Sequence, residues 1–181
     1  AAPFAFEGHP PHCPSINCGD RSAVIELGGP LWGIGLGIVD TTRTDKPRAG
    51  RKAPDWVQHR NRLAPDDVTE RDGVRFSKAP RAALEVCTIA NAEAGLIATN
   101  GLLRIKAMTV TEFHDTVDAH QDWPNSLSVN VVRQLTTDKT GSVAEDRFLY
   151  LAFRQGLPRP ELQYEVFDES GALVGLTDFA W

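Results

Sequence analysis

The chain has 181 residues, of which 41% are hydrophobic and 24% are charged, and this composition excludes a disordered or collagen-like protein. A chain of this length can bury roughly 70% of the surface that it exposes when unfolded, so it can fold without disulfides or a structural metal. The net charge of -5 argues against binding of phosphate backbones over the whole surface, but it is compatible with a local basic patch.

The number of cysteines indicates whether the compartment is oxidising or reducing. Cys13, Cys18 and Cys87 are three in number, which excludes a closed disulfide framework and favours a reducing compartment. The apolar runs are also far shorter than the roughly 18 residues needed to span a bilayer. We therefore expect a cytoplasmic protein.

Residues 1–76 are predicted to form a mixed N-terminal region. Apolar runs at 23–27 and 31–39 predict a short helix or strand followed by a strand. The segment 43–62 contains seven basic and two acidic residues together with Pro and Gly, which predicts an exposed basic loop leading into a strand at 56–59.

This basic loop is the candidate surface for nucleic acid. Its proposed phosphate contacts are Arg48, Arg51, Lys52, Arg60 and Arg62. Trp56 is available for stacking on a base. The alternative is that the charges only solvate a loop, because charge runs often do no more than that.

Residues 77–138 are predicted to be helical. Asp72-Gly73 predicts a turn between two extended segments, and Ser77 is a candidate cap for a helix over 78–90. A second helix is expected over 91–103. Thr109 with Glu112 forms a capping-box pattern for a third helix to about residue 120. Apolar residues at helical spacing between 127 and 135 predict a fourth.

Residues 139–181 carry the clearest pattern. Ser142 and Glu145 form another capping-box pattern, and the helix that they begin is expected to end at Gly156. Two strands follow over 162–167 and 172–179, joined by a turn that ends in Gly171.

One acid in this last region is placed unusually. Side chains alternate along a strand, so Asp178 shares a face with the apolar residues Val174 and Leu176. An ionised acid on a buried face needs a cation, hydrogen bonds or a proton. Asp178 is therefore either a strand-end polar group or a ligand of Mg²⁺, with Glu145 as the second carboxylate. Glu145 could equally serve as a helix cap alone.

Several segments resemble a known family. The segments of the last region are GSVAEDR at 141–147, GLPRP at 156–160, QYEV at 163–166, Gly171 and TDFAW at 177–181. They resemble the start of the very-short-patch-repair-like endonuclease domain found in many actinobacterial and phage proteins. Upstream, HRNRL at 59–63, DDV at 66–68 and GVRFSKAPR at 73–81 resemble the middle region of the same proteins, which are described as AbiEi-type antitoxins or transcriptional regulators.

The resemblance implies an α+β fold whose last region, 139–181, begins a restriction-endonuclease-like sheet. It also implies that Glu145 and Asp178 belong to a PD-(D/E)XK-type site, which would bind Mg²⁺ and hydrolyse DNA. The family pattern continues after the Trp with a further acidic strand, so we expect this 181-residue chain to be inactive in cleavage. The alternative is a non-enzymatic antitoxin or regulator that binds DNA or a toxin partner.

Three weaker patterns are interpreted as structural. His9, His12, Cys13 and Cys18 could supply zinc ligands, but their spacing and the prolines among them favour a terminal loop. The glycines at 33, 35 and 37 lack a complete phosphate-binding fingerprint and favour a bent strand. Cys87 lies on the apolar face of its predicted helix, which favours a packed thiol.

Overall fold

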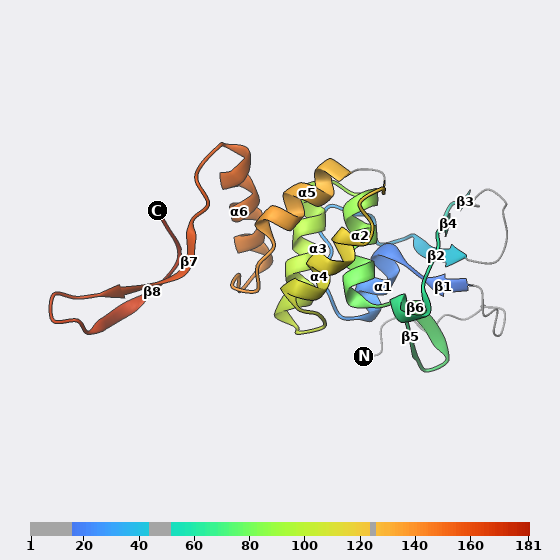
Figure 1. Ribbon diagram of the computed structural model, residues 1–181, viewed down its shortest axis with the longest axis horizontal. Helices are drawn as coiled ribbons and strands as arrows, with labels where there is room; N and C mark the ends of the chain where they lie inside the picture. The colour runs from blue at the N-terminus through green and yellow to red at the C-terminus, as the bar shows by residue number, and fades with distance from the viewer. Residues whose placement is uncertain (1–15, 44–51, 124–125) are drawn as a thin grey trace.

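The computed structural model describes residues 16–43, 52–123 and 126–181 (Figure 1). Within these ranges the chain has an α+β fold, with a mixed sheet at one end, helices in the centre and a separate two-stranded hairpin at the other end. None of the helices in these ranges combines the length and the apolar character that crossing a bilayer requires.

The sheet has six strands in the order β3-β4-β2-β1-β6-β5. The strands are β1 (Ile16–Cys18), β2 (Val39–Arg43), β3 (Lys52–Ala53), β4 (Trp56–Arg60), β5 (Val68–Arg71) and β6 (Val74–Ser77). β2 pairs with β4, and β1 with β6, in parallel, while the other neighbours are antiparallel. A short 3-10 helix, Pro65–Asp67, connects β4 to β5. The sheet thus brings together strands that precede, lie within and follow the basic segment, which is the name used below for residues 43–62.

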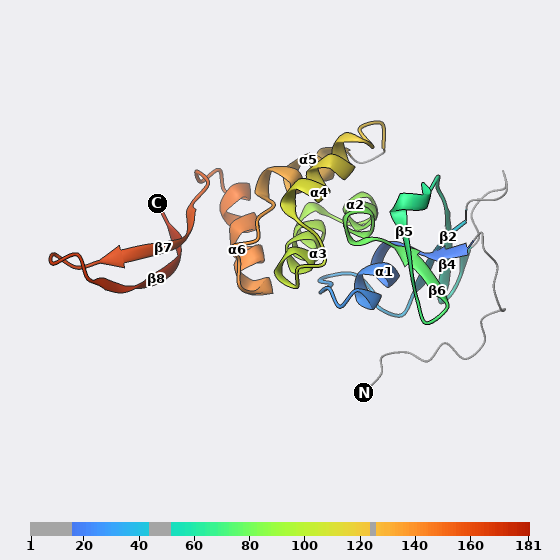
Figure 2. The same cartoon turned by 60° about the horizontal axis from the view of Figure 1, so that its bottom comes forward.

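Six helices are described. They are α1 (Asp20–Glu26), α2 (Ala79–Ile89), α3 (Ala92–Arg104), α4 (Val110–Asp118), α5 (Ser126–Leu135) and α6 (Val143–Arg154). α1 packs on β2 and α2, while α3 lies at the centre of the helices and contacts α2, α5 and α6 (Figure 2). The apolar core is continuous from Val24 in α1 through Leu96 in α3 to Leu149 in α6. It therefore joins the sheet end of the molecule to the last helix.

Most of the predicted elements are confirmed. The turn at Asp72-Gly73 has φ values of 53° and 77° and joins β5 to β6. The Thr109–Glu112 capping box begins α4 as predicted. These two local signals were sufficient because each depends on residues only a few positions apart. The structure adds a cap that the sequence did not predict, since the Asn91 side chain accepts a hydrogen bond from the backbone N–H of Ala94 at the start of α3.

Two predictions are wrong. The apolar run 31–39 is not a strand, because β2 begins only at Val39 and the preceding chain is irregular. Pro30, just before this run, packs so closely on α3 that a Cβ added to Gly101 would lie 2.1 Å from its Cδ. Ser77 does not cap α2. The residue at the cap position is Lys78, while the Ser77 hydroxyl donates to Glu85 Oε2 at 3.1 Å.

The C-terminal hairpin is formed by β7 (Glu161–Phe167) and β8 (Leu173–Ala180), as predicted. It extends away from the helices (Figures 1 and 2). Its root packs on α6 through the rings of Phe148 and Phe179, whose centroids lie 4.7 Å apart. Further out, apolar side chains of both strands, including those of Val174 and Leu176, are exposed to solvent. The face shared by Val174, Leu176 and Asp178 is therefore not a buried face.

Candidate functional site

Glu145 lies at the start of α6, where its carboxylate serves as part of the helix cap. The Ser142 hydroxyl donates to Glu145 Oε1 at 2.8 Å, and the backbone N–H of Gly141 donates to Oε2 at 2.7 Å. The Ser142 hydroxyl oxygen in turn accepts from the backbone N–H of Glu145. Both carboxylate oxygens are thus engaged by neighbouring residues of the same turn.

Asp178 lies in β8 and is exposed. Its Oδ1 accepts a hydrogen bond from Gln163 Nε2 across the hairpin, at 3.2 Å. Asp178 and Glu145 come from the hairpin and from the cap of α6, and the ring contact between these two elements runs through Phe148 and Phe179. Asp178 therefore lacks the dehydrated setting in which a carboxylate would require a cation.

The basic segment is described only in part. Arg48 and Arg51 lie outside the described residues, and Lys52 belongs to β3. Arg60 ends β4 and Arg62 follows it, and both side chains are exposed. Arg60 is the register partner of Arg43 in the neighbouring strand β2. Two arginines are therefore side by side on adjacent strands.

The structure also shows the environments of Trp56, Cys87 and Cys18, which the sequence suggested as candidate functional residues. Trp56 Nε1 donates to Thr41 Oγ1 at 2.9 Å, and its side chain is half-buried. Cys87 is fully buried, and burial raises its pKa to about 12, as expected for a packed thiol. Burial and the nearby Glu26 raise the pKa of Cys18 to about 11. The other proposed zinc ligands, His9, His12 and Cys13, lie outside the described residues.

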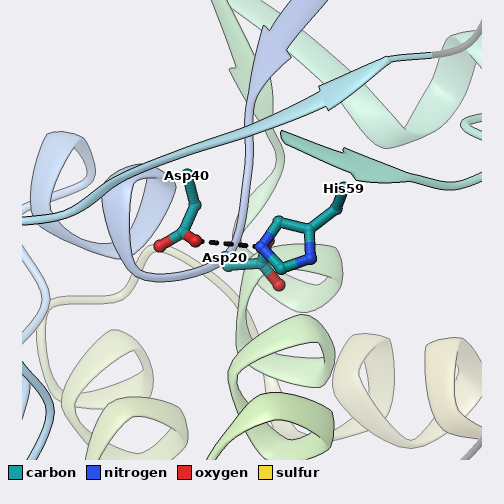
Figure 3. A group of neighbouring side chains, drawn as sticks. All are labelled: Asp20, Asp40 and His59. Atoms are coloured by element: carbon teal, nitrogen blue, oxygen red, sulfur yellow. Dashed lines mark hydrogen bonds and ion pairs between the residues drawn. The ribbon is translucent and has the colours of Figure 1, made fainter. Parts of the chain in front are cut away.

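Sequence reasoning missed the most concentrated group of ligand-type side chains in the described ranges. It consists of Asp20 at the start of α1, Asp40 in β2 and His59 in β4, and we call it the Asp20 cluster (Figure 3). His59 Nε2 lies 2.9 Å from Asp40 Oδ1 and 3.4 Å from Asp20 Oδ2. The side chains of Asp20 and Asp40 are 5% and 0% exposed, whereas that of His59 is 30% exposed.

Local backbone geometry positions Asp20. Its φ of 47° lies in the left-handed region, which costs an ordinary residue about 1–3 kcal/mol, although Asp tolerates it better than most. The preceding Gly19 lies so close to β2 that an added Cβ would be 2.6 Å from Thr42 Oγ1. The backbone N–H of Asp20 donates to Glu85 Oε2 at 2.9 Å. Burial first, and then the negative charge of Glu85, raise the pKa of Asp20 to about 7.

Asp40 is held by two cationic side chains. The Arg21 guanidinium binds both of its oxygens and also donates to the carbonyl oxygen of Gly35 at 3.2 Å. His59 Nε2 donates to Asp40 Oδ1, and this hydrogen bond raises the pKa of His59 above its ordinary value, although burial opposes the shift. Two carboxylates and an imidazole at these distances can share a proton or hold a cation.

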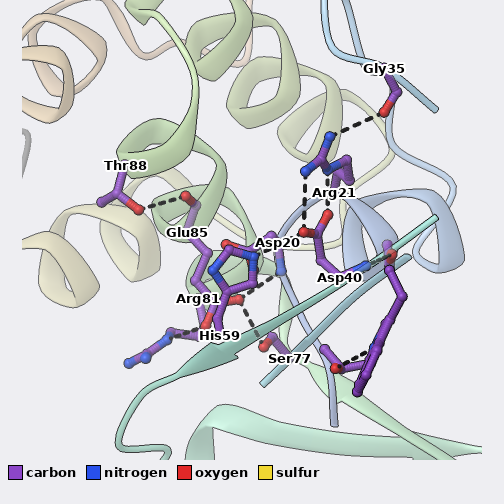
Figure 4. A network of polar contacts seen from close by, with 12 residues as sticks. Asp20, Arg21, Gly35, Asp40, His59, Ser77, Arg81, Glu85 and Thr88 are labelled. Atoms are coloured by element: carbon purple, nitrogen blue, oxygen red, sulfur yellow. Dashed lines mark hydrogen bonds and ion pairs between the residues drawn. The ribbon is translucent and has the colours of Figure 1, made fainter. Parts of the chain in front are cut away.

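A buried ion pair lies directly beneath the cluster (Figure 4). Arg81 Nε donates to Glu85 Oε1 at 2.9 Å, and both side chains are almost fully buried. Arg81 also donates to the carbonyl oxygen of Arg62 at 3.1 Å and to His120 Nε2 at 2.7 Å. Its guanidinium carbon lies 4.2 Å from the centre of the Trp123 ring. Arg81 thereby connects the chain after β4, helix α2 and the end of α4.

A second buried polar group lies among the helices. Asp146 in α6 is fully buried, and its Oδ1 accepts hydrogen bonds from Asn100 Nδ2 at 2.8 Å and from Thr140 Oγ1 at 2.7 Å. Arg104 Nη1 lies 2.9 Å from its Oδ2. We call these four residues the Asp146 cluster. Burial raises the pKa of Asp146, while the surrounding hydrogen bonds and Arg104 oppose that shift.

Comparison with known proteins adds no relative. No family model, no curated protein and no solved structure matches this chain. The family resemblance of the short sequence segments therefore remains an expectation.

Proposed function

We propose that this chain associates with DNA through its basic segment and acts as a binding protein, in the manner of an antitoxin or regulator, rather than as a nuclease. The observation that carries the proposal is the exposure of Arg60 and Arg62 at the end of β4. Exposed guanidinium groups on one short stretch of chain can contact neighbouring phosphates of a nucleic-acid backbone.

The charges around these two arginines support the same proposal. Arg62 follows two residues after Arg60, is also exposed, and belongs to the segment in which basic residues outnumber acidic residues seven to two. Phosphate contacts by arginine position a protein on DNA without reading its sequence. The whole chain is acidic, so such binding would be confined to this segment.

The environment of the two acids favours binding over cleavage. Glu145 has both oxygens in hydrogen bonds within the α6 cap, and Asp178 is exposed on the hairpin. A nuclease site would need these acids to share a Mg²⁺ ion that neutralises phosphate charge. Among the described residues, the group of ligand-type side chains that lies close together is the Asp20 cluster instead.

The test is a salt titration of binding to a labelled duplex, followed by fluorescence anisotropy. Replacement of both Arg60 and Arg62 by Gln should lower the affinity at low salt and reduce the slope of log K against log salt by about two. The double variant Arg133→Gln/Arg154→Gln, which removes the same charge from α5 and α6, serves as the control. An unchanged slope in the first variant would contradict the proposal.

A nicking assay separates the binding and cleavage functions. Supercoiled DNA is incubated with the wild-type protein and with Asp178→Ala, with and without Mg²⁺. We expect the same background in all four reactions. Mg²⁺-dependent nicking that disappears in Asp178→Ala would establish the nuclease alternative and assign its metal to that acid.

A further inference from the structure

We propose that Asp20, Asp40 and His59 form a binding site for a divalent transition-metal cation, with Mn²⁺ or Zn²⁺ favoured over Mg²⁺. The site is independent of the proposed DNA surface. His59 lies on one face of β4, and the side-chain alternation of a strand places Arg60 on the opposite face.

The distances between the donor atoms fit a shared cation. His59 Nε2 lies 2.9 Å from Asp40 Oδ1 and 3.4 Å from Asp20 Oδ2, and all three donor atoms lie within 4.8 Å of one another. Two ligand atoms bound to one Zn²⁺ at about 2.0–2.1 Å, with a tetrahedral angle between them, are about 3.4 Å apart. The three side chains could therefore close on an ion with only small adjustments.

One oxygen in the cluster has no hydrogen bond to account for its burial. Asp20 Oδ2 is inaccessible to solvent and accepts none, although the side chain that carries it is 95% buried and directed at His59 (Figure 3). Buried carboxylate oxygens in folded proteins normally have donors. A cation between Asp20 Oδ2 and His59 Nε2 would supply the missing partner.

The charge around the cluster also favours a cation. The carboxylates of Asp20, Asp40 and Glu85 lie close together, and the permanent cations facing them are Arg21 and Arg81 (Figure 4). Three acids facing two guanidinium groups leave one negative charge, which a proton on His59 compensates when no metal is bound. A metal ion would take the place of that proton, because neutral imidazole is the form that binds metal.

The donor types indicate which cation. Mg²⁺ prefers oxygen ligands and retains several waters, whereas an imidazole nitrogen combined with carboxylate oxygens suits Zn²⁺ or Mn²⁺. Arg21 grips the oxygens of Asp40 and orients that carboxylate, as outer-sphere groups commonly do. The 30% exposure of the His59 side chain provides a route by which an ion could enter.

Calorimetric titration of the full, chelator-treated chain with MnCl₂ tests the proposal. Mn²⁺ is the better probe because the thiols and imidazoles near the start of the chain would compete for Zn²⁺. We expect one ion per chain. Outer-sphere changes alone alter metal affinity about 10–100-fold, so Asp20→Asn and His59→Gln should each weaken binding by at least about tenfold.

The matched control is Asp146→Asn, which alters a second buried carboxylate and should leave the affinity for Mn²⁺ unchanged. Thermal unfolding provides the second measurement. Added Mn²⁺ should raise the melting temperature of the wild type and of Asp146→Asn, but not that of Asp20→Asn or His59→Gln. Absence of binding in the wild type, or equal affinity in all four proteins, would overturn the proposal.

Discussion

The Asp20 and Asp146 clusters both contain a buried carboxyl group whose pKa is raised by burial, but their oxygens are used differently. In the Asp146 cluster, Oδ1 accepts two hydrogen bonds, and Oδ2, which accepts none, lies 2.9 Å from Arg104, a permanent cation. Asp20 Oδ2 also accepts no hydrogen bond, but its cationic neighbour is His59 at 3.4 Å, which is charged only when protonated, and Glu85 adds a further negative charge beside it. A cluster that is complete in permanent charges indicates a structural role, whereas one that is incomplete in them indicates a site that a bound ion can complete.

The largest expected effect comes from removing the centre of the complete cluster. Asp146→Ala would leave Asn100 Nδ2 and Thr140 Oγ1 without their acceptor and Arg104 without its carboxylate partner. Loss of one partner from a buried charged pair costs about 3–5 kcal/mol. Urea unfolding should therefore show a large decrease in the free energy of unfolding, and a loss under about 1 kcal/mol would show that the cluster is not structural.

In the Asp20 cluster, the mutational change in the free energy of unfolding should have the opposite sign. Asp20→Asn removes a negative charge that lies beside Asp40 and Glu85, and it leaves the size of the side chain unchanged. In chelator-treated protein we expect the free energy of unfolding to rise by about 1 kcal/mol, because functional sites commonly retain unfavourable charges. A decrease of similar size would mean that Asp20 is already compensated within the fold.

The smallest expected effect is a dependence of folding stability on pH, which arises from the titration of Asp146. The pKa of Asp146 is raised, so the folded state holds this proton more tightly than the unfolded state. Its contribution to stability is fully present below about pH 4 and is lost as pH rises through the folded pKa.

Asp146→Asn removes this titration. The stability of the wild type relative to that of Asp146→Asn should therefore fall between pH 4 and pH 7. Thermal unfolding across that range measures the difference. A relative stability that rises with pH would mean that the hydrogen bonds outweigh burial and that the pKa is lowered instead.

The sequence predicts the features that depend on neighbouring residues and misses those that depend on residues far apart in the chain. Local signals located the helices that begin near Thr109 and Ser142 and the two strands of the C-terminal hairpin, because each signal lies within one turn or one strand. The Asp146 cluster depends on α3 and α6 packing together, and the Asp20 cluster on three segments spread over 40 positions. No local spacing encodes such contacts.

Asp40 and Asp178 show why local sequence does not locate the buried acids. Asp40 comes directly after an apolar run and Asp178 follows apolar positions in its own strand, yet Asp40 is buried and Asp178 is exposed. The parallel pairing of β2 with β4 brings His59 to Asp40, and parallel partners cannot be identified from a hairpin turn. The alternation along the strand predicts a buried face for Asp178, but in the structure the hairpin leaves the apolar residues of that face, Val174 and Leu176, exposed.

The contacts of Arg81 affect how the molecule unfolds. This single guanidinium bonds to the carbonyl oxygen of Arg62 on the sheet side and to His120 at the end of α4. Separating the sheet from the helices would break the hydrogen bond from this buried guanidinium to Arg62 and would expose the apolar surface between the two parts. We therefore expect sheet and helices to melt in a single cooperative transition, with matching midpoints for a probe near Trp56 and one near Trp123.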